Sequence, residues 1–226
     1  MNLELAKYID HTLLSPSATR AEITKLCSEA KEYGFFAVCV NPYWVRHAVK
    51  ELASSQVAVA AVIGFPLGAN LTDVKVAEAQ RAIAEGAEEL DLVINIGALK
   101  DKEAGYVEEE IRSIVRAARG AMVKVIIECD LLTDDEKVVA AQCCVNAGAS
   151  MVKTSTGLVK DGKGATVEDI ELIKRTIAGS TLGIKASAGI RDYDKAKALI
   201  DAGATRLGTS AGVAIVSGAK AVQGAY

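Results

Sequence analysis

Short runs rich in Val and Ile alternate with longer segments of helical periodicity along the whole chain. A period of two residues predicts eight strands, over residues 7–12, 36–40, 57–65, 89–96, 123–128, 151–155, 183–188 and 205–209. A period of 3.6 residues predicts amphipathic helices between them, including residues 19–34, 73–87, 107–120, 134–148, 167–179 and 192–203. The pattern therefore indicates one strand–helix unit repeated from end to end.

The helical segments carry start and stop signals of their own. Thr19 with Glu22, and Thr133 with Glu136, match the S/T-x-x-E capping box that begins many helices. Glycine, which readily adopts the left-handed conformation that stops a helix, follows most of them. These glycines are Gly34, Gly86, Gly120, Gly148, Gly179 and Gly203.

Strands that alternate with helices predict a parallel sheet with right-handed crossovers. Eight such units can close into a TIM (β/α)8 barrel, which is the fold we expect. An open doubly wound sheet is the main alternative, but no GxGxxG or GxxxxGK[ST] motif follows an early strand. We expect a single domain over residues 1–226 with a short N-terminal extension, because no linker or low-complexity segment interrupts the pattern.

The strand pattern assigns charged side chains to the inside of this barrel. In ELDLVINI the leucine and isoleucine positions share one face, which must pack against helices, so Asp91 faces inward. The same alternation in VKVIIE places Lys124 and Glu128 inside, and on the next two strands it places Lys153 and Lys185 inside. Charges in such a place are costly unless they are paired, which makes them candidates for a functional site.

Lys153 and Lys185 lie near the C-terminal ends of consecutive strands, where the catalytic groups of TIM barrels gather. Burial and a neighbouring cation both lower the pKa of a lysine, so one of these amines can be neutral near pH 7. A neutral amine can form a Schiff base with a carbonyl compound and support cleavage or formation of the adjacent carbon–carbon bond. Asp91 and Lys185 could then carry protons. A structural ion network, or lysines that extend to solvent, is the alternative.

Two motifs at the ends of the last two predicted strands, KASAGIR and RLGTSAG, suit phosphate binding through loop N–H groups. Gly189, Gly208 and Ser210 are residue types that such a site uses, and Thr156 in KTSTG adds a further donor. The same residues also suit ordinary turns. Two alternative functions therefore stay open: a barrel enzyme that isomerises a phosphosugar without a covalent adduct, and a phosphometabolite binder without catalysis.

Composition excludes several other classes. A net charge of -3 and 4% aromatic residues give no basis for nucleic-acid binding, and the apolar runs are too short to span a membrane. The N-terminus lacks the features of a signal peptide, so we expect a cytosolic protein. Five cysteines without a CxxC motif and two histidines without HxxxH spacing predict neither a disulfide framework nor a zinc site. A carboxylate magnesium site would need no histidine.

Motifs between Tyr8 and Ser210 resemble those of the deoxyribose-phosphate aldolases, a family of class I, Schiff-base aldolases on a TIM barrel. The similar stretches are IDHTLLSPSAT, YGFFAVCVNP, VIGFPLGA, ELDLVINIGALK, VKVIIE, LLTDDEK, VKTSTG, KASAGIR and RLGTSAG. The resemblance implies reversible cleavage of 2-deoxy-D-ribose 5-phosphate to D-glyceraldehyde 3-phosphate and acetaldehyde, in deoxyribonucleoside catabolism. It also implies that neither a metal nor an organic cofactor is needed and that the protein is a homo-oligomer, a dimer or larger.

The resemblance assigns residue roles as well. It implies that Lys153 forms the Schiff base, that Lys185 lowers the pKa of Lys153, and that Asp91 with Lys185 relays protons. Asp10 is expected to contact a substrate hydroxyl, and the C-terminal Tyr226 is a candidate for protonating the enamine. The expected phosphate-binding residues are Thr156, Ala188, Gly189, Gly208 and Ser210.

One of these positions departs from the family pattern. The family usually has paired glycines in KASGGIR, and Ala188 replaces the first of them here. The backbone N–H is still present, so phosphate binding should persist unless the position needs a positive φ.

Overall fold

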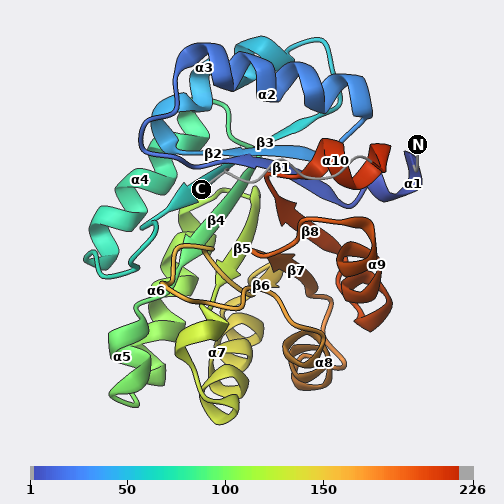
Figure 1. The fold of residues 1–226 in the computed structure, drawn as a ribbon. Coiled ribbons are helices and arrows are strands. Elements are labelled where there is room, and N and C mark those ends of the chain that lie inside the picture. The colour runs from blue at the N-terminus through green and yellow to red at the C-terminus, as the bar shows by residue number, and fades with distance from the viewer. Residues whose placement is uncertain (1–2, 219–226) are drawn as a thin grey trace.

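The protein, described here over residues 3–218 by a computed structural model, forms a closed barrel of eight parallel strands (Figure 1). The strands are β1 (Ile9–Leu13), β2 (Ala37–Val40), β3 (Ala58–Ile63), β4 (Glu89–Val93), β5 (Met122–Ile126), β6 (Met151–Lys153), β7 (Gly183–Ser187) and β8 (Arg206–Thr209). Each strand pairs with the next in chain order, and β8 pairs with β1 to close the ring. The predicted TIM barrel is confirmed.

Seven helices connect the strands and surround the barrel (Figure 1). They are α2 (Arg20–Tyr33), α3 (Val45–Leu52), α4 (Thr72–Ala84), α6 (Ala104–Ala117), α7 (Asp134–Ala147), α8 (Val167–Thr176) and α9 (Tyr193–Ala202). The shorter elements are α1 (Leu3–Ala6), which is the expected N-terminal extension, η1 (Pro42–Trp44), α5 (Ile96–Lys100), η2 (Cys129–Leu131) and α10 (Gly212–Ser217). In the described part of the chain, no helix has the length and apolar character needed to cross a bilayer.

Helix termini follow the local signals of the sequence. Thr19 and Thr133 each accept a hydrogen bond from the backbone of the glutamate three residues on, and both capping boxes are complete. Gly34 and Gly148 end their helices in the left-handed conformation, with φ of 67° and 77°.

Several strands end earlier than the alternation of residues predicts. The predicted strand over residues 89–96 is wrong beyond Val93, because Asn95 caps α5 by accepting the N–H of Ala98 at 3.1 Å. The predicted strand over residues 123–128 is wrong beyond Ile126, and Glu128 has a left-handed φ of 62°. A side-chain cap after β4 and a left-handed residue after β5 thus end these two strands at the mouth of the barrel.

The inside of the barrel is divided between apolar and charged side chains. Leu14, Cys39, Ala60 and Val62 form a small buried apolar cluster that is separate from the main core between strands and helices. The strands on the other side contribute buried lysines and carboxylates instead of the branched aliphatic layers that usually fill such barrels. All five cysteines are buried, free thiols.

Candidate active site

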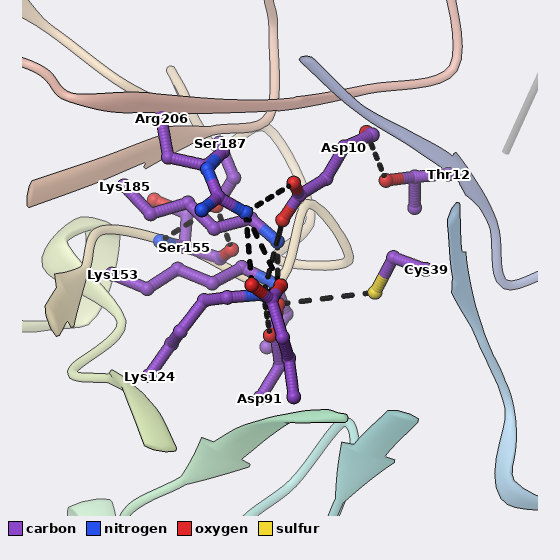
Figure 2. Close-up of polar contacts among 12 residues, drawn as sticks. Asp10, Thr12, Cys39, Asp91, Lys124, Lys153, Ser155, Lys185, Ser187 and Arg206 are labelled. Atoms are coloured by element: carbon purple, nitrogen blue, oxygen red, sulfur yellow. Dashed lines mark hydrogen bonds and ion pairs between the residues drawn. The ribbon is translucent and has the colours of Figure 1, made fainter. Parts of the chain in front are cut away.

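Seven charged side chains meet inside the barrel, and Figure 2 shows most of them converging from different strands. Each is at most 4% exposed. The carboxylates are Asp10, Glu89 and Asp91, and the cationic groups are Lys124, Lys153, Lys185 and Arg206. We call this set the charge network.

Strand register brings the network together. Asp91 on β4 lies directly opposite Lys124 on β5, and Lys153 on β6 lies directly opposite Lys185 on β7. Gly208 on β8 leaves space for this arrangement, because a Cβ there would lie 3.0 Å from Cε of Lys185. The interior placement of these four charged side chains agrees with the alternation of the sequence. The fifth residue predicted to face inward, Glu128, lies beyond the end of β5 and accepts hydrogen bonds from Thr156 instead of joining the network.

Asp91 is the centre of the network (Figure 2). Its Oδ1 accepts from Lys124 at 2.9 Å, and its Oδ2 accepts from both Lys153 and Lys185 at 2.7 Å. The two lysine nitrogens that share Oδ2 are therefore at most twice that distance, 5.4 Å, apart. Burial alone would raise the pKa of Asp91, but the three lysines outweigh it and hold the pKa well below its ordinary value. Cys39 Sγ lies 3.8 Å from Oδ2.

Asp10 and Glu89 complete the carboxylate side of the network. Asp10 accepts from Lys185, from Lys124 at 3.1 Å and from Arg206 at 2.8 Å. Burial opposes ionisation of Asp10, yet these cations hold its pKa below the ordinary value. Glu89 contacts Lys124 at 2.6 Å and Arg206 at 3.2 Å.

Lys153 has the fewest carboxylate partners of the four cations. It contacts Asp91 alone, whereas Lys185 and Arg206 each contact two carboxylates and Lys124 contacts three. Burial lowers the pKa of Lys153, Asp91 opposes that effect, and Lys185 lowers the pKa further, so the result lies below the ordinary value. Burial acts in the same direction on Lys124 and Lys185, but their carboxylates outweigh it and raise both pKa values.

The net charge of the network also identifies Lys153 as the cation that most readily loses its proton. Three carboxylates face four cationic groups, so the network is neutral when one of the cations has lost its proton. Lys153, which has a single carboxylate partner and a lowered pKa, is the group that can lose it at the least electrostatic cost. The site can therefore hold an uncharged primary amine at the C-terminal end of β6, and such an amine is a nucleophile toward carbonyl carbon.

The residues expected to bind phosphate lie at the ends of three neighbouring strands. Thr156 follows β6, Ala188 and Gly189 follow β7, and Gly208 and Ser210 lie at the end of β8 and just after it. Thr156 donates its N–H and its hydroxyl to Glu128.

Ala188 occupies a position that needs a positive φ. Its φ is 73°, and that of Gly189 is 70°, so two successive residues are left-handed after β7. The substitution of alanine for the family's glycine thus places a Cβ in a strained backbone conformation. Tyr226 lies outside the described residues.

Sequence reasoning did not assign Glu89 or Arg206 to the site. The signal was present, because Glu89 shares the inner face of its strand with Asp91, and Arg206 shares the inner face of its strand with Gly208. Arg206 also lies over the ring of Phe36, with 3.4 Å from Cζ to the ring centroid, at the N-terminal end of the barrel. Glu89 and Arg206 therefore form the part of the network that lies toward the N-terminal ends of the strands.

A separate cavity of about 560 Å³ lies beside the barrel, between η2, α7, α8 and the loop that follows β6. Asp130, Lys137, Lys163 and Arg175 are among its lining residues, and no member of the charge network is. Within residues 3–218, no cluster of three or more His, Cys, Asp or Glu side chains is arranged to hold a metal ion.

Comparison with known proteins identifies close relatives. The model of the DeoC/LacD family aldolases matches residues 5–221. The chain is 55% identical over 219 residues to the deoxyribose-phosphate aldolase of an Exiguobacterium species, covering 96% of this chain and 98% of that protein. It is also 55% identical to the deoxyribose-phosphate aldolase of Streptococcus sanguinis, covering 97% and 98%. The tetrameric deoxyribose phosphate aldolase of Aeropyrum pernix is similar in structure, with a TM-score of 0.88, 35% identity, and coverage of 95% of this chain and 90% of that chain.

Proposed function

The chain belongs to the DeoC/LacD family of aldolases, and from that premise we propose that it reversibly cleaves 2-deoxy-D-ribose 5-phosphate, with Lys153 as the Schiff-base nucleophile. The products are D-glyceraldehyde 3-phosphate and acetaldehyde, so the enzyme is a carbon–carbon lyase. The single observation that carries the assignment of Lys153 is its position as the one network cation with a single carboxylate partner.

The first half of the reaction forms the imine. The neutral Nζ of Lys153 adds to the aldehyde carbon C1 of the open-chain sugar and gives a carbinolamine, which loses water to become a protonated imine. Asp91 Oδ2 lies 2.7 Å from both Lys153 and Lys185, and it offers a path for the protons that these steps move.

The second half breaks the carbon–carbon bond. A base removes the proton of the C3 hydroxyl, the C2–C3 bond breaks, and its electron pair moves toward the iminium nitrogen. D-glyceraldehyde 3-phosphate leaves, and an enamine of acetaldehyde stays on Lys153. Protonation of the enamine at C2 and addition of water then release acetaldehyde and restore the amine. We assign the proton transfers to Lys185 with Asp91, and Tyr226 stays a candidate for protonation at C2.

The phosphate group is assigned to the loops after β6, β7 and β8. Backbone N–H groups of Ala188, Gly189 and Gly208, with the hydroxyl of Ser210, are the proposed donors, and Thr156 belongs to the same end of the site. Asp10 is assigned to holding Lys185 in place, since its carboxylate already accepts from three cations. Its contact with a substrate hydroxyl stays a prediction.

No metal or organic cofactor is proposed, because the protonated imine itself accepts the electron pair released by the broken bond.

We also infer a cytosolic location and a homo-oligomer. The relative from Aeropyrum pernix is tetrameric, and Tyr43, Leu67 and Leu71 of this chain are each at least 70% exposed, so they are accessible to a second copy. Nucleic acid and membranes are not proposed as partners.

Trapping of the imine tests the proposal. Treatment with acetaldehyde and borohydride should convert the imine into a stable ethylamine on Lys153, which peptide mass spectrometry locates. Lys153→Arg should abolish both the adduct and cleavage of the sugar phosphate, since a guanidinium cannot form the imine. Lys25→Arg, at an exposed position of α2 on the outside of the barrel, is the matched control and should keep both.

Two outcomes would reject the assignment. An ethyl group found only on other lysines would remove Lys153 from the reaction. Turnover of the phosphosugar that survives in Lys153→Arg would favour isomerisation without a covalent adduct instead.

A further inference from the structure

Glu128 lies just after β5, in the turn that contains η2, and the proposed reaction gives it no role. It is 1% exposed. Both of its carboxylate oxygens accept the N–H of Thr156 at 3.2 Å, and Oε2 also accepts the Thr156 hydroxyl. The N–H of Cys129 donates to the carbonyl of Thr154 at 2.8 Å. This turn is therefore bonded to the first residues that follow the catalytic strand β6.

Asp130, two residues further along, holds the other end of the same loop. Its Oδ1 accepts the N–H of Lys163 at 2.9 Å, and its Oδ2 accepts the N–H of Gly164 at 3.0 Å. Gly164 in turn packs directly on Ala188, since a Cβ at Gly164 would lie 2.5 Å from the Ala188 carbonyl oxygen. Ala165 donates its N–H to that oxygen at 3.1 Å.

We propose that Glu128 and Asp130 are positioning residues that hold the two ends of loop 154–165 against the loop after β7 and so determine the affinity for the phosphate end of the substrate. The inference rests on the proposed function, which places Thr156 and Ala188 at that end. Backbone donors bind an anion tightly when they are already oriented, because less conformational freedom is lost on binding. Two carboxylates on one short turn provide that orientation from outside the substrate site.

The backbone of Glu128 supports this role. Its φ of 62° is uncommon for a residue other than glycine, and such conformations persist where the surrounding contacts require them. Burial raises the pKa of Glu128, and the bonds from Thr156 oppose that rise. The bonds between Glu128 and Thr156 therefore stabilise both the left-handed backbone of Glu128 and the position of Thr156.

The direction in which substrate affinity changes when Glu128 or Asp130 is replaced distinguishes a positioning role from charge repulsion. Removing a negative charge near a phosphate site would by itself strengthen binding of the substrate. If Glu128 and Asp130 act by orienting the loop, their removal should weaken binding instead.

Steady-state kinetics on Glu128→Gly, Glu128→Gln and Asp130→Asn, with 2-deoxy-D-ribose 5-phosphate as substrate, tests the proposal. Glycine keeps the left-handed backbone and removes the carboxylate, so Glu128→Gly should raise KM about tenfold with kcat changed by less than about twofold. Glutamine keeps one acceptor oxygen, so its KM should rise by about threefold. Asp130→Asn should raise KM by a similar threefold.

Acetaldehyde carries no phosphate, so trapping on Lys153 provides the internal reference. It should proceed in all three variants at no less than the wild-type rate, because removing the charge of Glu128 removes a carboxylate that interacts with Lys153 and so favours the neutral amine. Trapping at that rate also shows that the barrel has folded. Glu171→Gln is the control: Glu171 is an exposed carboxylate that lines the same side cavity, and its loss should leave KM unchanged.

The possible failures are distinguishable. No trapping in the wild-type protein would reject the proposed function itself. Normal trapping with an unchanged or lowered KM in the variants would reject only the positioning role, and so would a fall in kcat with slow trapping, which would place these residues at the imine. If Glu128→Gly does not fold, Glu128→Gln and Asp130→Asn decide between the same outcomes.

Discussion

In a Lys185→Met variant, Lys153 loses the cation with which it shares Oδ2 of Asp91. Asp91 stays in place, and the network keeps three carboxylates but only three cationic groups. With Lys153 protonated, the network of the variant is neutral, whereas in the native protein a protonated Lys153 leaves one excess positive charge. The pKa of Lys153 should therefore rise, because the lowering effect of Lys185 is gone and the carboxylates of Asp10 and Asp91 have lost a partner.

The size of the shift follows from the geometry. The two nitrogens lie at most 5.4 Å apart, twice the 2.7 Å that joins each to the same oxygen. With an effective dielectric constant of about 20, two unit charges at that distance repel by about 3 kcal/mol, or about two pKa units. At a pH below the pKa of Lys153 in both proteins, each unit of pKa lowers the neutral fraction tenfold, so trapping of acetaldehyde there should slow by about a hundredfold.

The assay measures reductive ethylation of Lys153 by acetaldehyde and cyanoborohydride as a function of pH, with peptide mass spectrometry as the readout. Imine formation reports on Lys153 without needing Lys185 for carbon–carbon cleavage. Loss of one member of a buried ion pair costs roughly 3–5 kcal/mol of stability, so the measurement belongs well below the unfolding temperature, with circular dichroism as the check on folding. Lys160→Met, which removes an exposed lysine, should leave the pH midpoint where it is. A midpoint that stays the same or falls in folded Lys185→Met would refute the coupling.

Two further substitutions test features of the fold. Ala188→Gly should raise the free energy of unfolding by about 1 kcal/mol, because glycine adopts the positive φ of this position without strain. Thermal unfolding should show a gain of about 2–4 °C in Tm. A lower Tm would contradict the proposed backbone strain at Ala188. Ser155→Ala should also stabilise, again by about 1 kcal/mol, because Ser155 Oγ is buried and has no hydrogen-bond partner among the described residues. A clear loss of stability in Ser155→Ala would mean that the hydroxyl is satisfied after all.

The architecture was predictable because each strand and helix carries its own local signal. Alternation located all eight strands, and capping boxes at Thr19 and Thr133 marked helix starts correctly. The strand ends were not predictable in the same way. Asn95 and Glu128 continue the alternation of residues, yet a single cap and a left-handed φ end the strands before them. Such endings depend on particular side chain–backbone bonds rather than on a repeating pattern.

The candidate site was predictable as a set of inward positions but not as a set of pairs. Alternation identified Asp91, Lys124, Lys153 and Lys185, because facing inward depends only on parity within each strand. The bond between Asp10 and Lys185 joins residues 175 positions apart. It exists because closing the ring brings β1 beside β8, and side chains then meet across the interior. The alternation of residues within one strand carries no information about contacts between residues so far apart in the sequence.

A buried lysine outside the charge network shows what distinguishes Lys153. Lys75 is fully buried, and burial lowers its pKa. Glu110, which lies 2.8 Å away, opposes that effect, and so does Glu78. Lys75 Nζ also donates to the carbonyl of Val93 at 3.0 Å.

The two lysines differ in what remains after the proton is lost. A neutral Lys75 would leave Glu110 as an unpaired buried charge, which is costly. A neutral Lys153 leaves Asp91 still bonded to Lys124 and Lys185, so the carboxylate keeps two cations. If the balance of charge governs reactivity, acetaldehyde and borohydride should modify Lys153 and leave Lys75 unmodified under native conditions. Equal modification of both lysines in folded protein would show that burial alone, and not the shared carboxylate, activates the amine.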